Sequence, residues 1–300
     1  FEGRVLSYEG NNFFLEGKDA KIISVSLNQL SKEDQKYLQE TVQAGKIGTG
    51  NPLEIASTPV EGKPWTVPSI GMEMIWCEPG TFMMGSPESE MGRREHDETQ
   101  HEVTLTEGFY LGKYEVTQEE YEKVMGKNPS TFKGNKLPVE MVNWNDAMEF
   151  CKRLTELEKK DEWVSKGWNY TLPTEAQWEY ACRAGTTTVY SWSDTISPEV
   201  GNYGASGLKK TISVGSYRSN PWGLFDMHGN AWEWVLDMKA NYPKGAVTDP
   251  KGSASGSLRV RRGGSWKNPG THLRSGKRHF LLPQSRSNNI GFRVGFQKSK

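Results

Sequence analysis

The sequence predicts an α+β protein with little regular secondary structure, preceded by a small β-barrel module. Three features predict this class: short β-type runs in residues 1–44, only three convincing helical patterns after them, and a Gly- and Trp-rich stretch from Gly185 onward without a helical period. That stretch must pack its loops on aromatic rings, because indole groups bury large areas with few torsions to fix. Ion pairs would add to its stability.

The composition excludes two classes of partner. The 300 residues hold 37 basic and 37 acidic side chains, so no net field draws nucleic acid or an anionic membrane to the surface. No apolar run reaches the ~18 residues that a membrane span needs. The chain starts at Phe1 rather than Met, which we interpret as a processed or truncated product.

The first predicted module covers residues 1–44. It begins with three β-type runs, at 4–10, 11–17 and 21–27. A helix is predicted over 31–42 with Ser31 as its N-cap. The segment FFLEGKDAKIISVSLNQLSKEDQKYLQE resembles the Sla-homology modules, which are SH3-like domains. This resemblance implies a docking or peptide-binding role.

A linker and one large domain follow. Residues 45–69 hold four prolines and show no apolar period, which predicts a semi-rigid linker. Residues 70–297 then form a continuous domain that contains every tryptophan except Trp65.

Three helices are predicted in this domain. In a capping box, Thr and a Glu or Gln three residues later satisfy free amide groups at the helix start. Thr117 with Glu120 forms one box, and Thr174 with Gln177 forms another, while Gly185 provides a C-terminal stop. The predicted helices span 117–125, 145–160 and 174–185.

Six motifs in order identify a family resemblance. They read YLGKYEVTQEEYEKVM, LPVEMVNWNDAMEFCKRL, YTLPTEAQWEYACRAG, NPWGLFDMHGNAWEWVLD, RRGGSW and NNIGFRV. The series resembles the formylglycine-generating enzyme family, also called the sulfatase-modifying factor family, over residues 70–297. The resemblance implies an elaborated C-type-lectin-like fold.

The cysteine pair of the active enzymes is missing. In those enzymes the pair follows the GGS(F/W) motif, binds copper and oxidises a substrate cysteine to formylglycine. Ungapped alignment puts Asn268 and Leu273 at these positions, and no cysteine follows Cys182. We therefore expect neither copper nor formylglycine-generating activity. Cys77, Cys151 and Cys182 are interpreted as inert core residues.

A polar pocket is still predicted after the double glycine. Ser265 and Asn289 match pocket positions of the family, and the candidate pocket residues are Ser265, Asn268, His272, Arg274 and Asn289. His272 and His279 lie seven residues apart on a segment predicted to be extended, which would place them on opposite faces. We therefore do not expect a metal site made from both histidines.

The segment DMHGNAWEW is a candidate calcium loop. Asp226 and Glu233 offer carboxylates, and Gly229 and Ala231 can offer backbone carbonyls, the hard oxygen donors that calcium prefers. The resemblance implies a structural Ca²⁺ here, with Asn in the family where this chain has Asp226. Alternatively, Asp226 and Glu233 only accept hydrogen bonds from nearby amides and arginines.

A charged loop spans residues 88–105. It contains acidic, basic and histidine residues whose charges alternate in sign, which is typical of a solvated face. We therefore do not expect it to bind metal.

These observations predict a non-catalytic binding or scaffold module with a structural calcium site. Its ligand would be a protein or peptide, or alternatively a carbohydrate, because a lectin-like pocket with aromatic walls can stack on either. The alternative is an oxidoreductase of the same family that uses a different metal or substrate. The calcium motif and the missing start indicate a bacterial periplasmic or cell-surface location.

Overall fold

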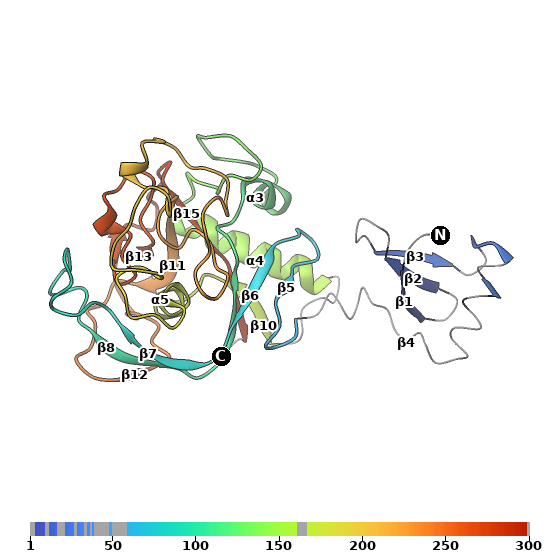
Figure 1. Cartoon of the computed structure of the whole chain (residues 1–300), viewed down its shortest axis with the longest axis horizontal. Coiled ribbons are helices and arrows are strands. Elements are labelled where there is room, and N and C mark those ends of the chain that lie inside the picture. The colour runs from blue at the N-terminus through green and yellow to red at the C-terminus, as the bar shows by residue number, and fades with distance from the viewer. Residues whose placement is uncertain are drawn as a thin grey trace. The chain divides into compact units, whose positions relative to one another are not determined.

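The computed structural model describes residues 4–9, 12–16, 22–26, 29–32, 35–36, 38, 48–49, 59–160 and 167–298. The chain divides into two compact units, Phe1–Pro59 and Val60–Lys300 (Figure 1). Within the described residues, no helix is both long and apolar enough to cross a membrane.

The first unit is a four-stranded sheet in the order β3-β2-β1-β4. Its strands are β1 (Arg4–Glu9), β2 (Asn12–Glu16), β3 (Ile22–Ser26) and β4 (Gly48–Thr49). The pairs β1–β2 and β2–β3 are antiparallel, whereas β4 runs parallel to β1. The three predicted strands are therefore present.

The helix predicted after these strands is seen only in part. Gln35 N–H donates to Ser31 O at 2.9 Å, as in a first helical turn. Most of the predicted helix lies outside the described residues.

The described residues of the second unit form three sheets. The five-stranded sheet has the order β10 (Trp168–Thr171), β16 (Gly295–Lys298), β9 (Phe109–Gly112), β6 (Glu73–Cys77), β5 (Trp65–Thr66). The four-stranded sheet has the order β14 (His279–Leu281), β13 (Arg259–Arg262), β11 (Trp232–Met238), β15 (Ile290–Phe292). The three-stranded sheet has the order β12 (Val247–Thr248), β8 (His101–Leu105), β7 (Gly80–Met84).

The three predicted helices are present as α3 (Gln118–Met125), α4 (Trp144–Lys160) and α5 (Glu175–Arg183). Both capping boxes form as predicted, at Thr117 and at Thr174. The left-handed turn that ends α5 starts one residue earlier than expected, at Ala184 (φ 48°). Two short 3₁₀ helices follow, η2 (Gly204–Ser206) and η3 (Gly270–His272).

Aromatic rings form much of the core, as the composition predicted. Phe150 of α4 stacks on Tyr121 of α3 with ring centroids 5.6 Å apart, and it meets Phe292 of β15 at 5.4 Å. In Figure 1, α4 passes behind β6 and reaches toward β10. The second unit is thus mostly β with few helices, and its loops rest on aromatic side chains.

The C-terminal end of the predicted linker belongs to the second unit. Trp65 and Thr66 form the edge strand β5, which pairs with β6. The Trp65 ring is buried and lies 5.0 Å from the Phe296 ring. The linker was predicted to end at residue 69, but the second unit begins before that. The prolines of this segment indicated a linker, although it contains an edge strand with one buried indole.

Candidate functional site

A hydrogen-bonded cluster surrounds Asn268 at one end of the four-stranded sheet of the second unit. Asn268 Oδ1 accepts from Ser265 Oγ at 2.6 Å and from Trp232 Nε1 at 2.7 Å. Asn289 Nδ2 donates to Ser265 Oγ at 3.0 Å, and Asn268 Nδ2 lies 3.2 Å from His272 Nδ1. We call Ser265, Asn268, His272, Asn289 and Trp232 the Asn268 cluster. It unites four of the five predicted pocket residues.

The double glycine positions this cluster. Gly263 and Gly264 have φ values of 91° and 76°, a region that favours glycine. A Cβ on Gly264 would lie 2.6 Å from Leu273 Cδ1 and 2.9 Å from the carbonyl oxygen of His272. Only a glycine lets the two segments approach closely enough to bring His272 to Asn268.

The other two residues named from the sequence lie elsewhere. Leu273 is buried in a small apolar cluster with Tyr190 and Tyr203. Arg274 does not join the Asn268 cluster, because its guanidinium donates to Glu98 Oε2 at 2.9 Å.

The two histidines of this segment meet the same indole. The Trp232 ring lies 6.3 Å from the His272 ring and 5.5 Å from the His279 ring. The expectation of opposite faces was wrong, because the segment is not extended: His272 ends η3, and the chain turns between the two residues, where the Lys277 amide donates to Arg274 O at 3.0 Å. Burial lowers the pKa of His279 to about 4 and also lowers the pKa of His272, so both rings are neutral near pH 7.

Arg261 also lies against the Trp232 indole. It pairs with His279 in the β13–β14 register, and its guanidinium carbon lies 4.7 Å from the centre of the Trp232 ring. Burial lowers the pKa of Arg261 to about 10. Arg261 was not among the predicted pocket residues, although its position two residues before the double glycine was a signal for it.

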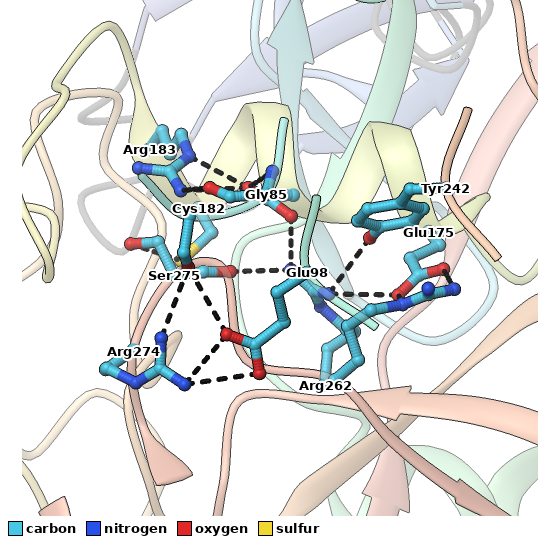
Figure 2. A network of polar contacts seen from close by, with 12 residues as sticks. Gly85, Glu98, Glu175, Cys182, Arg183, Tyr242, Arg262, Arg274 and Ser275 are labelled. Atoms are coloured by element: carbon cyan, nitrogen blue, oxygen red, sulfur yellow. Dashed lines mark hydrogen bonds and ion pairs between the residues drawn. The ribbon is translucent and has the colours of Figure 1, made fainter. Parts of the chain in front are cut away.

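A buried ionic network connects β13 to α5 (Figure 2). Arg262 donates through Nη1 to Glu175 Oε1 at 2.9 Å and through Nη2 to Glu179 Oε2 at 2.5 Å. Glu179 also pairs with Arg183 at 2.9 Å, and Glu175 pairs with Arg278 at 2.6 Å. These five side chains are buried, so the network is structural.

The loop 88–105 contributes to the same interior. Glu98 is fully buried and accepts from Arg274 at 2.9 Å and from Lys277 at 3.3 Å (Figure 2). Glu90 pairs with Arg274 as well. The predicted solvated face was therefore wrong for these two acids. The alternating charges of a loop do not predict that basic residues from a distant segment will pair with its acids and bury them.

The candidate calcium loop is divided between two environments. Both oxygens of Glu233 accept from Arg293, at 2.6 and 2.7 Å, and Oε2 also accepts from Trp178 Nε1 at 2.6 Å. This carboxylate matches the alternative of hydrogen bonds to nearby donors. Asp226 Oδ2 accepts the Gly215 amide at 2.7 Å, and its backbone is left-handed (φ 58°).

A third carboxylate adjoins this loop. Glu115 Oε1 accepts the Ala231 amide at 2.9 Å, and Oε2 accepts from Asn230 Nδ2 at 2.6 Å. Burial, together with the charges of Asp226 and Glu233, raises the pKa of Glu115 well above its ordinary value. Burial thus favours the protonated, neutral form of Glu115.

A cavity of about 10 Å³ lies beside the loop, lined by residues that include Asn202, Asp226 and Gly229. Its size suits one water molecule or one ion. In the part of the chain that the structure describes, no three His, Cys, Asp or Glu side chains are arranged to hold a metal. An ion there would depend on Asp226 and on backbone or amide oxygens, while Glu233 in its present pairing does not fit as a ligand.

The three cysteines are free and buried. Burial raises the pKa of the Cys182 thiol to about 12 and raises those of Cys77 and Cys151 further. Since the thiolate is the reactive form, none of them is poised for nucleophilic or redox chemistry. The sequence prediction of inert core thiols is confirmed.

The fold and the motif order define a domain of the formylglycine-generating type. Residues 63–297 match the sulfatase-modifying factor enzyme 1-like domain, and the chain belongs to that family. The three-sheet architecture is consistent with the expected C-type-lectin-like fold.

Known relatives have differing activities. The chain is 33% identical to the chaperone protein LppX of Paenibacillus barcinonensis over 208 residues, which cover 55% of this chain and 71% of that protein. It is 26% identical to the formylglycine-generating enzyme of Mus musculus over 291 residues, which cover 74% of each. Among solved structures, Treponema denticola variable protein 1 superposes with a TM-score of 0.69 and 30% identity, covering 79% of this chain and 99% of that one.

Proposed function

We propose that this protein is a non-catalytic member of its family that binds a protein or peptide ligand at the Asn268 cluster. One observation carries the proposal. At the two positions where the resembled enzymes have cysteines, Asn268 accepts two hydrogen bonds and Leu273 packs in an apolar cluster. The site thus offers amide, hydroxyl, imidazole and indole groups suited to recognition, but no thiolate to bind copper or a substrate cysteine.

The similarity to a protein named as a chaperone supports a protein or peptide ligand. The Trp232 ring is fully buried and supports the site from below, and the partly exposed His272 and His279 add polar edges that remain neutral near pH 7. Aromatic walls with a few fixed polar groups are typical of ligand sites.

The absence of formylglycine-generating activity can be tested directly. We expect no loss of mass from the cysteine of a short CxPxR-type peptide after incubation with the protein, copper and oxygen. The reason is that the substrate thiolate and copper need sulfur partners that this site lacks. A formylglycine-generating enzyme serves as the positive control. Conversion above the buffer background would contradict the proposal.

We further propose a structural calcium ion beside the candidate loop. Asp226 lines the adjoining cavity together with Asn202, Gly229 and Asn230, which offer carboxylate, amide and backbone oxygens of the kind that calcium prefers. Arg218 lines the cavity as well, so Asp226 supplies the negative charge that an ion there requires. Asp226 and backbone oxygens, among them that of Gly229, are the residues that would hold the ion.

Calcium removal should lower the thermal stability of the second unit. At calcium about 100-fold above Kd, a single site that binds only the folded state contributes about 2.7 kcal/mol. For a domain of this size we expect a chelator to lower Tm by roughly 5–10 °C. Asp226→Ala should abolish this difference, whereas Glu122→Ala, which changes an exposed acid on α3, should preserve it. An unchanged wild-type Tm with and without chelator would rule out the site.

A further inference from the structure

Arg261 differs from the other buried arginines of the described residues. Six arginines are at most 9% exposed: Arg183, Arg261, Arg262, Arg274, Arg278 and Arg293. Five of them pair with a glutamate within 2.9 Å. Arg261 is 9% exposed, and no described carboxylate contacts it. A buried charge without a counter-charge is costly, so this exception calls for a ligand.

The contacts of Arg261 leave part of its hydrogen-bonding capacity unused. Its Nε and Nη2 atoms each lie 3.4 Å from His279 Nδ1, and its plane covers the Trp232 ring. No described residue accepts from Nη1. A guanidinium has five N–H donors in a planar fork. The Trp232 ring and His279 Nδ1 engage only some of them, so several donors remain for an acceptor on a ligand.

Two partly exposed histidines, His272 and His279, lie near the same indole and have unused donors. His279 Nδ1 faces Arg261, and His272 Nδ1 faces Asn268 Nδ2. A neutral imidazole whose Nδ1 accepts a hydrogen bond carries its proton on Nε2. No hydrogen bond of either Nε2 to a described residue is seen, so both N–H groups remain for a ligand.

Basic side chains also lie near the histidines. Those that lower the pKa of His279 include Arg261, Arg94 and Lys277. Lys277 is paired with Glu98 and Arg94 with Asp97, which leaves Arg261 as the one of these three without an acidic partner among the described residues. A ligand that meets Arg261 therefore finds donors and positive potential.

We propose that the unpaired guanidinium of Arg261, which lies over the buried Trp232 ring, binds a carboxylate of the ligand. This inference rests on the proposed binding function and names the chemistry that the site recognises. A single unpaired guanidinium matches a monoanion, and its fork fits the two oxygens of a carboxylate. A phosphate dianion would leave one negative charge without a partner. In a peptide ligand the group is either an Asp or Glu side chain or the C-terminal carboxylate.

The test uses the full chain and follows the indole N–H signal of Trp232 by NMR, which is assigned by its loss in Trp232→Phe. At constant ionic strength, acetate should shift this signal, whereas acetamide and inorganic phosphate should not. Arg261→Gln should weaken acetate binding about tenfold or more, because a charge-assisted bond is lost. Arg261→Lys keeps the charge but loses the fork, so it should bind with intermediate strength.

Arg259→Gln is the matched control. Arg259 lies on the same face of β13, with its guanidinium 3.7 Å from the centre of the Trp144 ring, and it donates to Leu236 O at 2.7 Å. Its loss should leave the acetate response unchanged. Arg261→Gln should also unfold at a temperature no lower than wild type, because it removes an unpaired buried charge. This separates lost binding from lost folding.

Three blocked tripeptides distinguish the two sources of the carboxylate. One carries Glu and an amidated C-terminus, one carries Gln and a free C-terminus, and one carries Gln and an amidated C-terminus. If only the Glu peptide binds, and Arg261→Gln weakens that binding, the site recognises an acidic side chain. If only the peptide with a free C-terminus does so, the site recognises the terminal carboxylate. The fully neutral peptide should not bind. Equal acetate responses in wild type and Arg261→Gln, or binding of phosphate in preference to acetate, would overturn the inference. Neither result would alter the outcome of the cysteine-conversion assay, so the two proposals can fail separately.

Discussion

Arg262→Met should destabilise the second unit by about 3–5 kcal/mol, because it removes one partner from a buried ionic network. Arg262 is fully buried, and its loss leaves Glu175 and Glu179 with only Arg278 and Arg183 as counter-charges. The carbonyl oxygen of Ser275, which accepts from Arg262 Nη2 at 2.5 Å, would also lose its donor. Thermal unfolding monitored by tryptophan fluorescence should show a Tm lowered by roughly 10 °C or more.

The matched control is Arg153→Met. Arg153 pairs with Glu149 at 2.7 Å on α4, but the two side chains are 48% and 42% exposed. Water and salt screen such a pair, so we expect its Tm to equal that of wild type within error. If both variants unfold at the same temperature as wild type, the buried network does not stabilise the domain.

Asp237→Asn should stabilise the protein above neutral pH. The Asp237 side chain is buried, and its Oδ2 accepts the Glu175 amide at 2.7 Å at the start of α5. Burial, and then the charge of Glu175, raises the pKa of Asp237 from 3.8 to about 7. Between these values the folded state binds a proton that the unfolded state does not, so the stability from this group falls as pH rises from about 4 to about 7.

The expected difference is large. A shift of about three pKa units corresponds to an upper limit on the order of 4 kcal/mol. Asn is neutral at every pH and keeps an oxygen for the Glu175 amide, so the variant should match wild type near pH 4 and exceed it near pH 8. Urea unfolding at the two pH values measures this. The control Asp194→Asn replaces an exposed acid that also accepts a backbone amide, from Val189 at 3.0 Å. An identical pH profile for wild type and Asp237→Asn would refute the assignment.

Features that depend on neighbouring residues could be predicted from the sequence. The capping boxes at Thr117 and Thr174 each lie within four residues, so the starts of α3 and α5 were predicted correctly. Ser265, Asn268 and Asn289 were chosen because they align with pocket positions of the resembled family, and the structure brings them together. His272 was misplaced because the segment after the double glycine was expected to be extended, whereas it forms η3 and then turns.

Features that depend on distant partners could not be predicted. Arg259, Arg261 and Arg262 share one short strand, and strand alternation places Arg262 on the opposite face from the other two. Nothing in that run shows that Arg262 meets Glu175 from 87 residues earlier while Arg261 meets no acid among the described residues. The same holds for Glu98, whose partner Arg274 follows 176 residues later.

The complete burial of α5 affects how the protein is made. Every residue from Glu175 to Arg183 is buried, so this helix has no solvent-facing side on which to form alone. Its counter-charges Arg262 and Arg278 are translated 87 and 103 residues after Glu175. At typical synthesis rates Arg278 is added to the chain roughly 5–20 s after Glu175. The second unit therefore completes its fold only after β13 and the segment up to Arg278 have been translated, and a chain that ends before them contains a helix without its counter-charges.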